Sequence, residues 1–180
     1  LVPNKLSVST ITQVLKNLLQ EGITLRDNRS IIDNLLAESV KTKDANQLTA
    51  LIRPHLGRII VQDIISVNEE LPIITLEQPL EQLLNNSIQN DSSTNDVFLE
   101  PKLIESIVAS VSIEKQNAEE RGNPAVMVVS PKIRPWLSRI LRQRLGNLSV
   151  LAYTEIPEDQ EIRVIGRVGI QDEQQNQVAA

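Results

Sequence analysis

The apolar residues of this 180-residue chain change their spacing partway along it, and this change restricts the possible folds most. Up to about residue 68 they recur at i, i+3, i+4 and i+7, as the buried stripe of a helix requires. Further on, short continuous apolar runs alternate with helical stripes, which is typical of buried strands between helices. The pattern predicts an α+β fold with a helical subdomain over 1–70, a small mixed α/β subdomain over 71–170 and a flexible tail over 171–180.

Three helices are expected in the helical subdomain. The first is predicted to start at Thr10 as N-cap and to end at Gly22, and the second to start near Ser30. The third starts at Asp44, and Pro54 should bend it because proline removes one backbone hydrogen bond. The predicted buried stripe of the first helix comprises Ile11, Val14, Leu15, Leu18 and Leu19.

The second subdomain should contain strand, helix, helix, strand, helix, strand and strand in that order. The expected strands are 73–76, 126–129, 149–153 and 162–168, and the helices start at Pro79, Pro101 and Pro131. A turn at Pro157 joins the last two strands, which predicts a hairpin and hence a mixed sheet. Polar residues fill 85–96, and the second half of this stretch is expected to be a mobile loop.

Composition excludes several classes of function. The chain has no cysteine, so it has no disulfide framework, thiolate zinc site or cysteine nucleophile. Its net charge of -5 argues against general nucleic-acid binding, which needs a surplus of lysine and arginine. No run approaches the roughly 20 apolar residues that span a membrane, and the chain starts at Leu1. We therefore expect a soluble segment of a longer protein, with any membrane anchor outside it.

Catalytic residues are not evident. His55 is the only histidine, and its position beside the apolar stripe predicts a helix-flank or partly buried side chain rather than a metal ligand or general base. The neighbouring carboxylates Glu69 with Glu70, and Glu119 with Glu120, are expected to be solvated surface groups. An enzyme, a cofactor site and a metal site are therefore not expected.

Basic residues concentrate on the helix predicted over 131–145. Its apolar stripe includes Trp136, and it leaves basic side chains on or beside the outer surface of an otherwise acidic protein. These are Lys132, Arg134, Arg139, Arg142 and Arg144. Such a face can dock an acidic partner or a neighbouring subunit, although a solvated helix face explains the same pattern about equally well.

A second polar feature lies between the first two helices. Arg26 and Arg29, on either side of Asp27, can bind a phosphate or carboxylate, or can fix the turn through ion pairs with Asp27 or Asp33. The structural role is slightly favoured. Two helices joined by such a turn also resemble a helix-turn-helix, which leaves nucleic-acid binding as a less favoured alternative because the chain is acidic.

Three stretches together resemble the FlhA-type export gate proteins of type III secretion, the FlhA/SctV family. They are LVPNKLSVSTITQVLKNLLQEGITLRDNRSIIDNLLAES, LPIITLEQPLEQLL and NPAVMVVSPKIRPWLSRILRQRLGNLSVLAYTEIPEDQEIRVIGRVG, in the order that the family has. They cover nearly the whole chain and are more similar to flagellar than to virulence injectisome members. Asn28 departs from the family, which usually has an apolar residue there.

The resemblance implies a non-enzymatic role in protein export. Members of this family have a polytopic membrane half and a cytoplasmic half. The cytoplasmic half forms a nonameric ring at the bacterial inner membrane and receives export chaperones and substrates. A separate export ATPase complex contributes energy. The chain would be the last two cytoplasmic subdomains, with the helical one making ring contacts and the terminal one partner contacts. The candidate contact residues are Arg26, Asp27, Arg29, Lys132, Arg134, Arg139 and Arg142. An injectisome export gate of the same family remains the alternative.

Overall fold

A computed structural model of the chain describes residues 6–88 and 99–170. The predicted tail over 171–180 and the predicted mobile half of the polar loop lie outside these residues. None of the helices that are described is both long enough and apolar enough to cross a membrane.

The chain forms two compact units. The helical unit consists of Leu1–Leu71 together with Tyr153–Glu161, and the sheet unit consists of Pro72–Ala152 together with Ile162–Ala180. The sequence places 71–170 as a whole in the second subdomain, whereas Tyr153–Glu161 pack with the helices. This difference arises because the chain leaves the sheet after its third strand and returns for the fourth.

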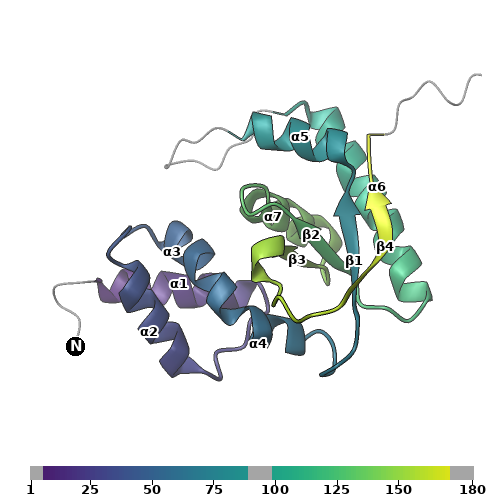
Figure 1. The fold of residues 1–180 in the computed structure, drawn as a ribbon. Helices are drawn as coiled ribbons and strands as arrows, with labels where there is room; N and C mark the ends of the chain where they lie inside the picture. The colour runs from purple at the N-terminus through teal and green to yellow at the C-terminus, as the bar shows by residue number, and fades with distance from the viewer. Residues whose placement is uncertain (1–5, 89–98, 171–180) are drawn as a thin grey trace, which may run out of the picture. The chain divides into compact units, whose positions relative to one another are not determined.

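The helical unit is built from short helices (Figure 1). These are α1 (Val8–Gln20), α2 (Asn28–Glu38), α3 (Ala45–Ile52), the 3₁₀ helix η1 (Arg53–Leu56) and α4 (Gly57–Gln62). The element α3 packs against both α1 and α2, and η1 packs against the 3₁₀ helix η2 (Tyr153–Glu155). The returning segment therefore completes the packing around η1.

The first helix differs at its start from the prediction. Its N-cap is Ser7, whose Oγ accepts a hydrogen bond from the backbone N–H of Thr10 at 3.0 Å, so the predicted cap at Thr10 is wrong by one turn. The earlier start does not change the phase of the stripe, and Leu18 is fully buried, but Leu19 is 56% exposed. Gly22 follows the helix with a positive φ of 75°, which confirms the predicted stop.

The predicted third helix is interrupted where proline enters it. The side chain of Asp44 accepts from the backbone N–H of Gln47 at 2.8 Å, which confirms the predicted cap. After Ile52 the backbone tightens into η1, which contains Pro54, and then continues as α4. Because proline cannot donate a backbone hydrogen bond, the expected bend appears as one 3₁₀ turn between two α-helices.

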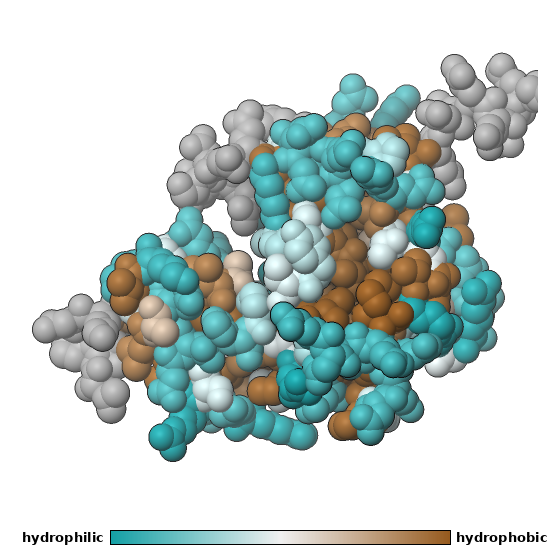
Figure 2. Space-filling view, viewed as in Figure 1, coloured by the Kyte–Doolittle hydropathy of each residue, from teal (hydrophilic) through white to brown (hydrophobic). Residues whose placement is uncertain are grey.

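The sheet unit confirms the predicted order of strands and helices. Its elements are β1 (Leu71–Leu76), α5 (Gln78–Ser87), α6 (Pro101–Glu120), β2 (Val126–Val129), α7 (Arg134–Leu145), β3 (Ser149–Ala152) and β4 (Ile162–Val168). All four residues of β2 are buried, as a strand covered on both faces requires. Hydrophilic side chains occupy the outward surface of α5 (Figure 2), where Gln78, Gln82 and Asn86 are exposed.

The sheet has the strand order β3-β2-β1-β4, and its first three strands are parallel. The N–H of Leu71 donates to the carbonyl of Glu161, and that of Glu77 donates to the carbonyl of Val168, so β4 also runs in the direction of β1. The predicted hairpin between β3 and β4 is therefore wrong. These strands lie at opposite edges because the segment between them is too long for a tight turn and packs with the helices.

The strand β4 contains a bulge. Between its two terminal hydrogen bonds to β1 it has one residue more than β1, so one residue is left out of the regular pairing. Both Ile165 and Val168 consequently face the core of the sheet unit. Gly166 lies between them, and a Cβ at this position would come within 2.3 Å of the Glu114 side chain.

The core of the sheet unit lies between the sheet and its helices. Its fully buried side chains come from β1, β2, α5, α6 and α7, with Met127 and Leu137 both at 0% exposure. Trp136 is 4% exposed, which confirms its predicted core position. A well-packed centre of this kind holds α7 in place and decides which of its basic residues reach solvent.

Candidate functional site

The turn between α1 and α2 is held by a helix cap. The Asp27 carboxylate accepts a hydrogen bond from the backbone N–H of Ser30 at 3.1 Å, and hydrogen bonds from Ser30 hold the pKa of Asp27 below its usual value. Arg29 and Asp33 form an exposed ion pair at 3.9 Å, one helical turn apart. Arg26 is exposed. The structural interpretation of this turn thus has a direct basis, while its two arginines remain open to solvent.

The basic residues of α7 separate into different environments. Arg139, Arg142 and Arg144 are exposed, whereas Arg134 is only 4% exposed, so its predicted place on the outer surface is wrong. The reason is helical phase, because Arg134 is three residues before Leu137 and shares its buried face.

Lys132 lies before α7 rather than within it. The predicted helix start at Pro131 is too early by three residues, because the backbone first forms a turn and the helix begins at Arg134. The Lys132 Nζ donates to the backbone carbonyl of Asn85 at 2.7 Å while the residue remains exposed. The exposed basic face therefore consists of Arg139, Arg142 and Arg144, with Lys132 near its start.

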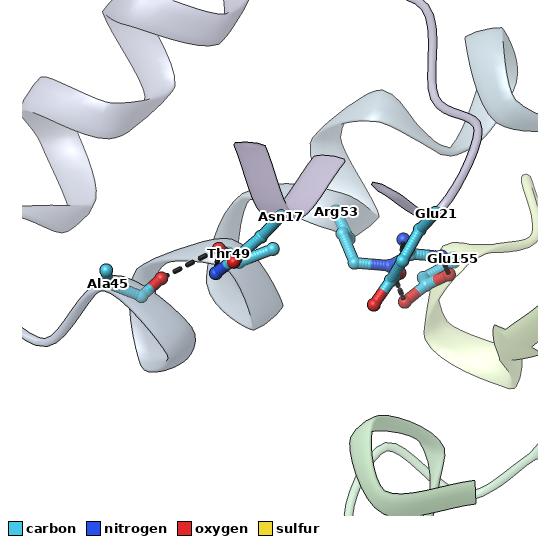
Figure 3. Close-up of polar contacts among 6 residues, drawn as sticks. All are labelled: Asn17, Glu21, Ala45, Thr49, Arg53 and Glu155. Atoms are coloured by element: carbon cyan, nitrogen blue, oxygen red, sulfur yellow. Dashed lines mark hydrogen bonds and ion pairs between the residues drawn. The ribbon is translucent and has the colours of Figure 1, made fainter. Parts of the chain in front are cut away.

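A buried charge cluster, which the sequence analysis missed, lies inside the helical unit (Figure 3). Arg53 is 2% exposed, and its Nε and Nη2 donate to the two carboxylate oxygens of Glu155, each at 2.7 Å. Its Nη1 contacts the carboxylate of Glu21. This bidentate geometry joins η1 to η2 across 102 positions of sequence and adds the end of α1.

The electrostatics of the cluster depend on both carboxylates. Burial acts to lower the pKa of Arg53, but the hydrogen bonds and charges of Glu155 and Glu21 outweigh it and raise that pKa. The guanidinium therefore stays charged, and a buried charge is tolerated only while its partners remain. One signal was present in the sequence, because Arg53 precedes the buried Leu56 by three residues and lies on the same stripe.

Close backbone packing supports the same cluster. A Cβ at Gly57 would lie 2.0 Å from the backbone carbonyl oxygen of Glu155, so only glycine fits there. In α3, four residues before Arg53, Thr49 accepts at its Oγ1 from the side-chain amide of Asn17 at 3.1 Å and donates to the Ala45 carbonyl at 2.7 Å (Figure 3). The cluster is thus a rigid, fully packed feature.

His55 lies on the outside of the same region. Its side chain is 49% exposed, which confirms the predicted helix-flank position, and its Nε2 lies 3.6 Å from a carboxylate oxygen of Glu38. Lys41 pairs with the other oxygen of that carboxylate at 2.7 Å and is the main reason that the pKa of Glu38 is lowered, against the opposing effect of burial. Among the residues that the structure describes, no cluster of three or more His, Asp or Glu side chains could hold a metal ion.

A polar hollow of about 250 Å³ lies in the helical unit. It is lined by α4, by the loop over 66–69 and by the end of the returning segment. At its rim Arg58 donates through Nη2 to both carboxylate oxygens of Asp159, at 3.0 and 3.1 Å, and both side chains are about two-thirds exposed. Mixed charge and open exposure make the hollow a place for water rather than a preformed apolar pocket.

Comparison with known proteins gives one consistent answer. Residues 1–161 match the model of the FHIPEP family. The chain is 36% identical over 169 residues to the flagellar biosynthesis protein FlhA of Salmonella typhimurium strain LT2, and the alignment covers 94% of the chain and 24% of that relative. The chain thus spans about a quarter of the length of the relatives it matches.

Solved structures of other proteins have the same fold. The nonameric SctV-C of EPEC superposes with a TM-score of 0.80 at 25% identity, over 91% of the chain and 49% of that structure. The Shigella flexneri MxiA protein superposes with a TM-score of 0.79 at 26% identity, over 91% of the chain and 51% of that structure. The fold, including both units, is therefore one that known proteins share.

Proposed function

The chain belongs to the FHIPEP family, and on this premise we propose that it is a cytoplasmic part of a flagellar type III protein export gate. The observation that carries the proposal is the 36% identity to FlhA along 94% of the chain. The identities to the SctV-C and MxiA structures are lower, at 25% and 26%, which favours flagellar over virulence use. An export gate of a virulence injectisome is the alternative.

The proposal includes assembly into a ring at the bacterial inner membrane. Its support is the nonameric SctV-C structure, whose fold the chain shares at a TM-score of 0.80. We assign ring contacts to the helical unit and partner contacts to the sheet unit. Native mass spectrometry of the complete cytoplasmic part tests the ring, and a strictly monomeric protein at all concentrations would count against it.

The proposal also assigns no catalytic role to the chain. The carboxylate pairs Glu69 with Glu70, and Glu119 with Glu120, are exposed, and the buried carboxylate of Glu155 is engaged by Arg53. Acid and base catalysis needs two groups held in contrasting environments around a cleft, and these groups do not meet that requirement. The chain would instead act by binding export chaperones, their substrates and the export ATPase complex.

The exposed basic face of α7 is our candidate for such a partner contact. Exposed arginines on one helix can steer and orient an acidic partner, and the effect weakens as salt is added. Basic residues near a helix C-terminus also favour the helix dipole, so exposure alone does not require a partner. A functional test is therefore needed.

The test compares two double variants in the full-length protein. Arg139→Glu with Arg142→Glu reverses the charge of the face, while Lys102→Glu with Arg121→Glu makes the same change of charge at exposed positions at the two ends of α6, Lys102 within its first turn and Arg121 directly after its last residue. We expect both to keep the melting temperature, and only the first to reduce motility and the capture of export chaperones in pull-downs. Normal motility with the first variant would remove α7 from the proposal, whereas capture of no chaperone by the unmodified protein would contradict chaperone docking itself.

A further inference from the structure

The segment Tyr153–Glu161 is attached to the helical unit at two ends that differ in character. It leaves the sheet at the end of β3 and continues into β4, yet its contacts belong to the helices. Its first end contains Glu155, which is 2% exposed and holds Arg53 through two hydrogen bonds. The backbone of Glu155 also presses against Gly57 with no room for a side chain. This end is therefore fixed by burial and by a charge that needs its partner.

The second end, up to Gln160, is held by side-chain contacts that water and salt can reach. Asp159 pairs with Arg58 in the open, and the Gln160 side-chain amide donates to the backbone carbonyl of Glu69 at 2.8 Å. Beyond these contacts, the N–H of the buried Leu71 donates to the carbonyl of Glu161 at 2.8 Å, as part of the pairing of β1 with β4. An exposed ion pair of this kind contributes little to stability and is weakened by salt.

Space for movement lies directly against this second end. The polar hollow of about 250 Å³ is lined on one side by Pro157, Asp159, Gln160 and Glu161. Its other side is formed by α4 and by the loop that contains Asn68, a non-glycine residue with a positive φ of 70°. Few packing contacts therefore oppose a displacement of this end, whereas the Glu155 end has no free volume around Gly57.

We propose that Tyr153–Glu161 is a strap with a fixed end at Glu155 and a releasable end at Asp159. Breaking the Arg58–Asp159 pair lets Pro157–Gln160 detach from the hollow, while Arg53, the helical core and the hydrogen bond between Leu71 and Glu161 stay in place. Glu161, which stays paired with Leu71, separates the detached segment from β4, the edge strand of the sheet. The strap is a conformational device of the fold and does not depend on the proposed export function.

Hydrogen–deuterium exchange of the intact chain, measured peptide by peptide, tests the strap. Arg58→Gln and Asp159→Asn each remove the outer pair, and Arg29→Gln is a matched control because it removes another exposed ion pair. We expect exchange over 156–161 to rise by about 1.5- to 5-fold in the two strap variants, the range that the loss of an exposed ion pair allows. Exchange in α1 and α3 should stay unchanged.

A change of salt concentration and the variant Glu155→Ala distinguish release of the outer end from unfolding of the helical unit. Raising the salt from about 0.05 M to about 0.5 M should speed exchange over 156–161 in the unmodified chain but not in Arg58→Gln, where the pair is already lost. Glu155→Ala should instead speed exchange throughout the helical unit. The proposal is overturned if the strap variants match Arg29→Gln over 156–161, or if their exchange rises equally in α1 and α3.

Discussion

Arg53 joins parts of the helical unit that lie far apart in the sequence. It stands in a 3₁₀ turn next to a proline, and its two carboxylate partners come from the end of α1 and from η2. Helical phase could have placed Arg53 inside, since it precedes Leu56 by three residues. Its main partner was beyond sequence reasoning, because no local pattern relates Arg53 to Glu155, 102 positions away.

The first prediction concerns this buried pair. Replacing Glu155 with alanine should lower the free energy of unfolding by about 3–5 kcal/mol, because it leaves a buried guanidinium with one partner. The exposed neighbour Glu158 serves as the control, and its replacement with alanine should cost less than about 0.5 kcal/mol. Urea titration of both variants measures the difference. Equal midpoints would show that Arg53 does not need Glu155 as a partner in the folded chain.

The second prediction concerns the loss of stability at low pH. Hydrogen bonds from Arg58 lower the pKa of Asp159 and those from Ser30 lower the pKa of Asp27, so both carboxylates bind protons more weakly in the folded chain than in the unfolded chain. Their stabilisation is complete above the unfolded carboxylate pKa of about 4 and is lost as the pH falls through the lower folded values. Asp159→Asn should therefore show a smaller loss of melting temperature from pH 6 to pH 3, each approximate, than the unmodified chain.

At the scale of elements, the sequence predicted types and order better than ends and neighbours. Apolar periodicity predicted every strand and helix of the sheet unit, because burial of one face depends only on local spacing. It could not decide between Ser7 and Thr10 as N-cap, since both residue types serve that role and the choice depends on the neighbouring packing. The predicted hairpin of β3 and β4 was wrong for a different reason, because which strands pair with one another depends on the whole path of the chain.

The third prediction tests the assignment of faces on α7. Leu137 is fully buried in the core of the sheet unit, so Leu137→Ala should cost about 2–5 kcal/mol through the cavity that it leaves. Arg142 lies on the exposed basic face, and Arg142→Ala should change stability by less than about 0.5 kcal/mol. Thermal unfolding followed by circular dichroism compares them. Similar losses for both would mean that the helix is rotated from the position described.

At the scale of the whole molecule, the two units are interleaved along the chain. The helices come first, the sheet follows, and the chain returns to the helical unit before it adds the last strand. A boundary near residue 71 was visible in the sequence as a change of period. The packing of Tyr153–Glu161 with the helical unit could not be predicted, because this segment has neither the apolar spacing of a helix nor that of a strand.

The fourth prediction follows from this interleaving. A fragment ending at residue 71 retains Arg53 and Glu21 but lacks Glu155, so its helices should melt at a lower temperature than in the full chain. Arg53→Met should destabilise the full chain, where it removes the guanidinium that two carboxylates share, yet leave the fragment unchanged or more stable. Circular dichroism of the four proteins gives the comparison. Destabilisation of the fragment by this change would contradict the account.

The path of the chain also limits how members of such a family can exchange parts. A chimera joined at residue 71 would combine the Arg53 of one parent with the Glu155 of another, together with whatever residue each parent has at position 57. A single crossover there separates side chains that must be compatible, whereas a double exchange that also carries 153–161 keeps them together. Recombination between homologous genes should therefore preserve these two distant stretches as a pair.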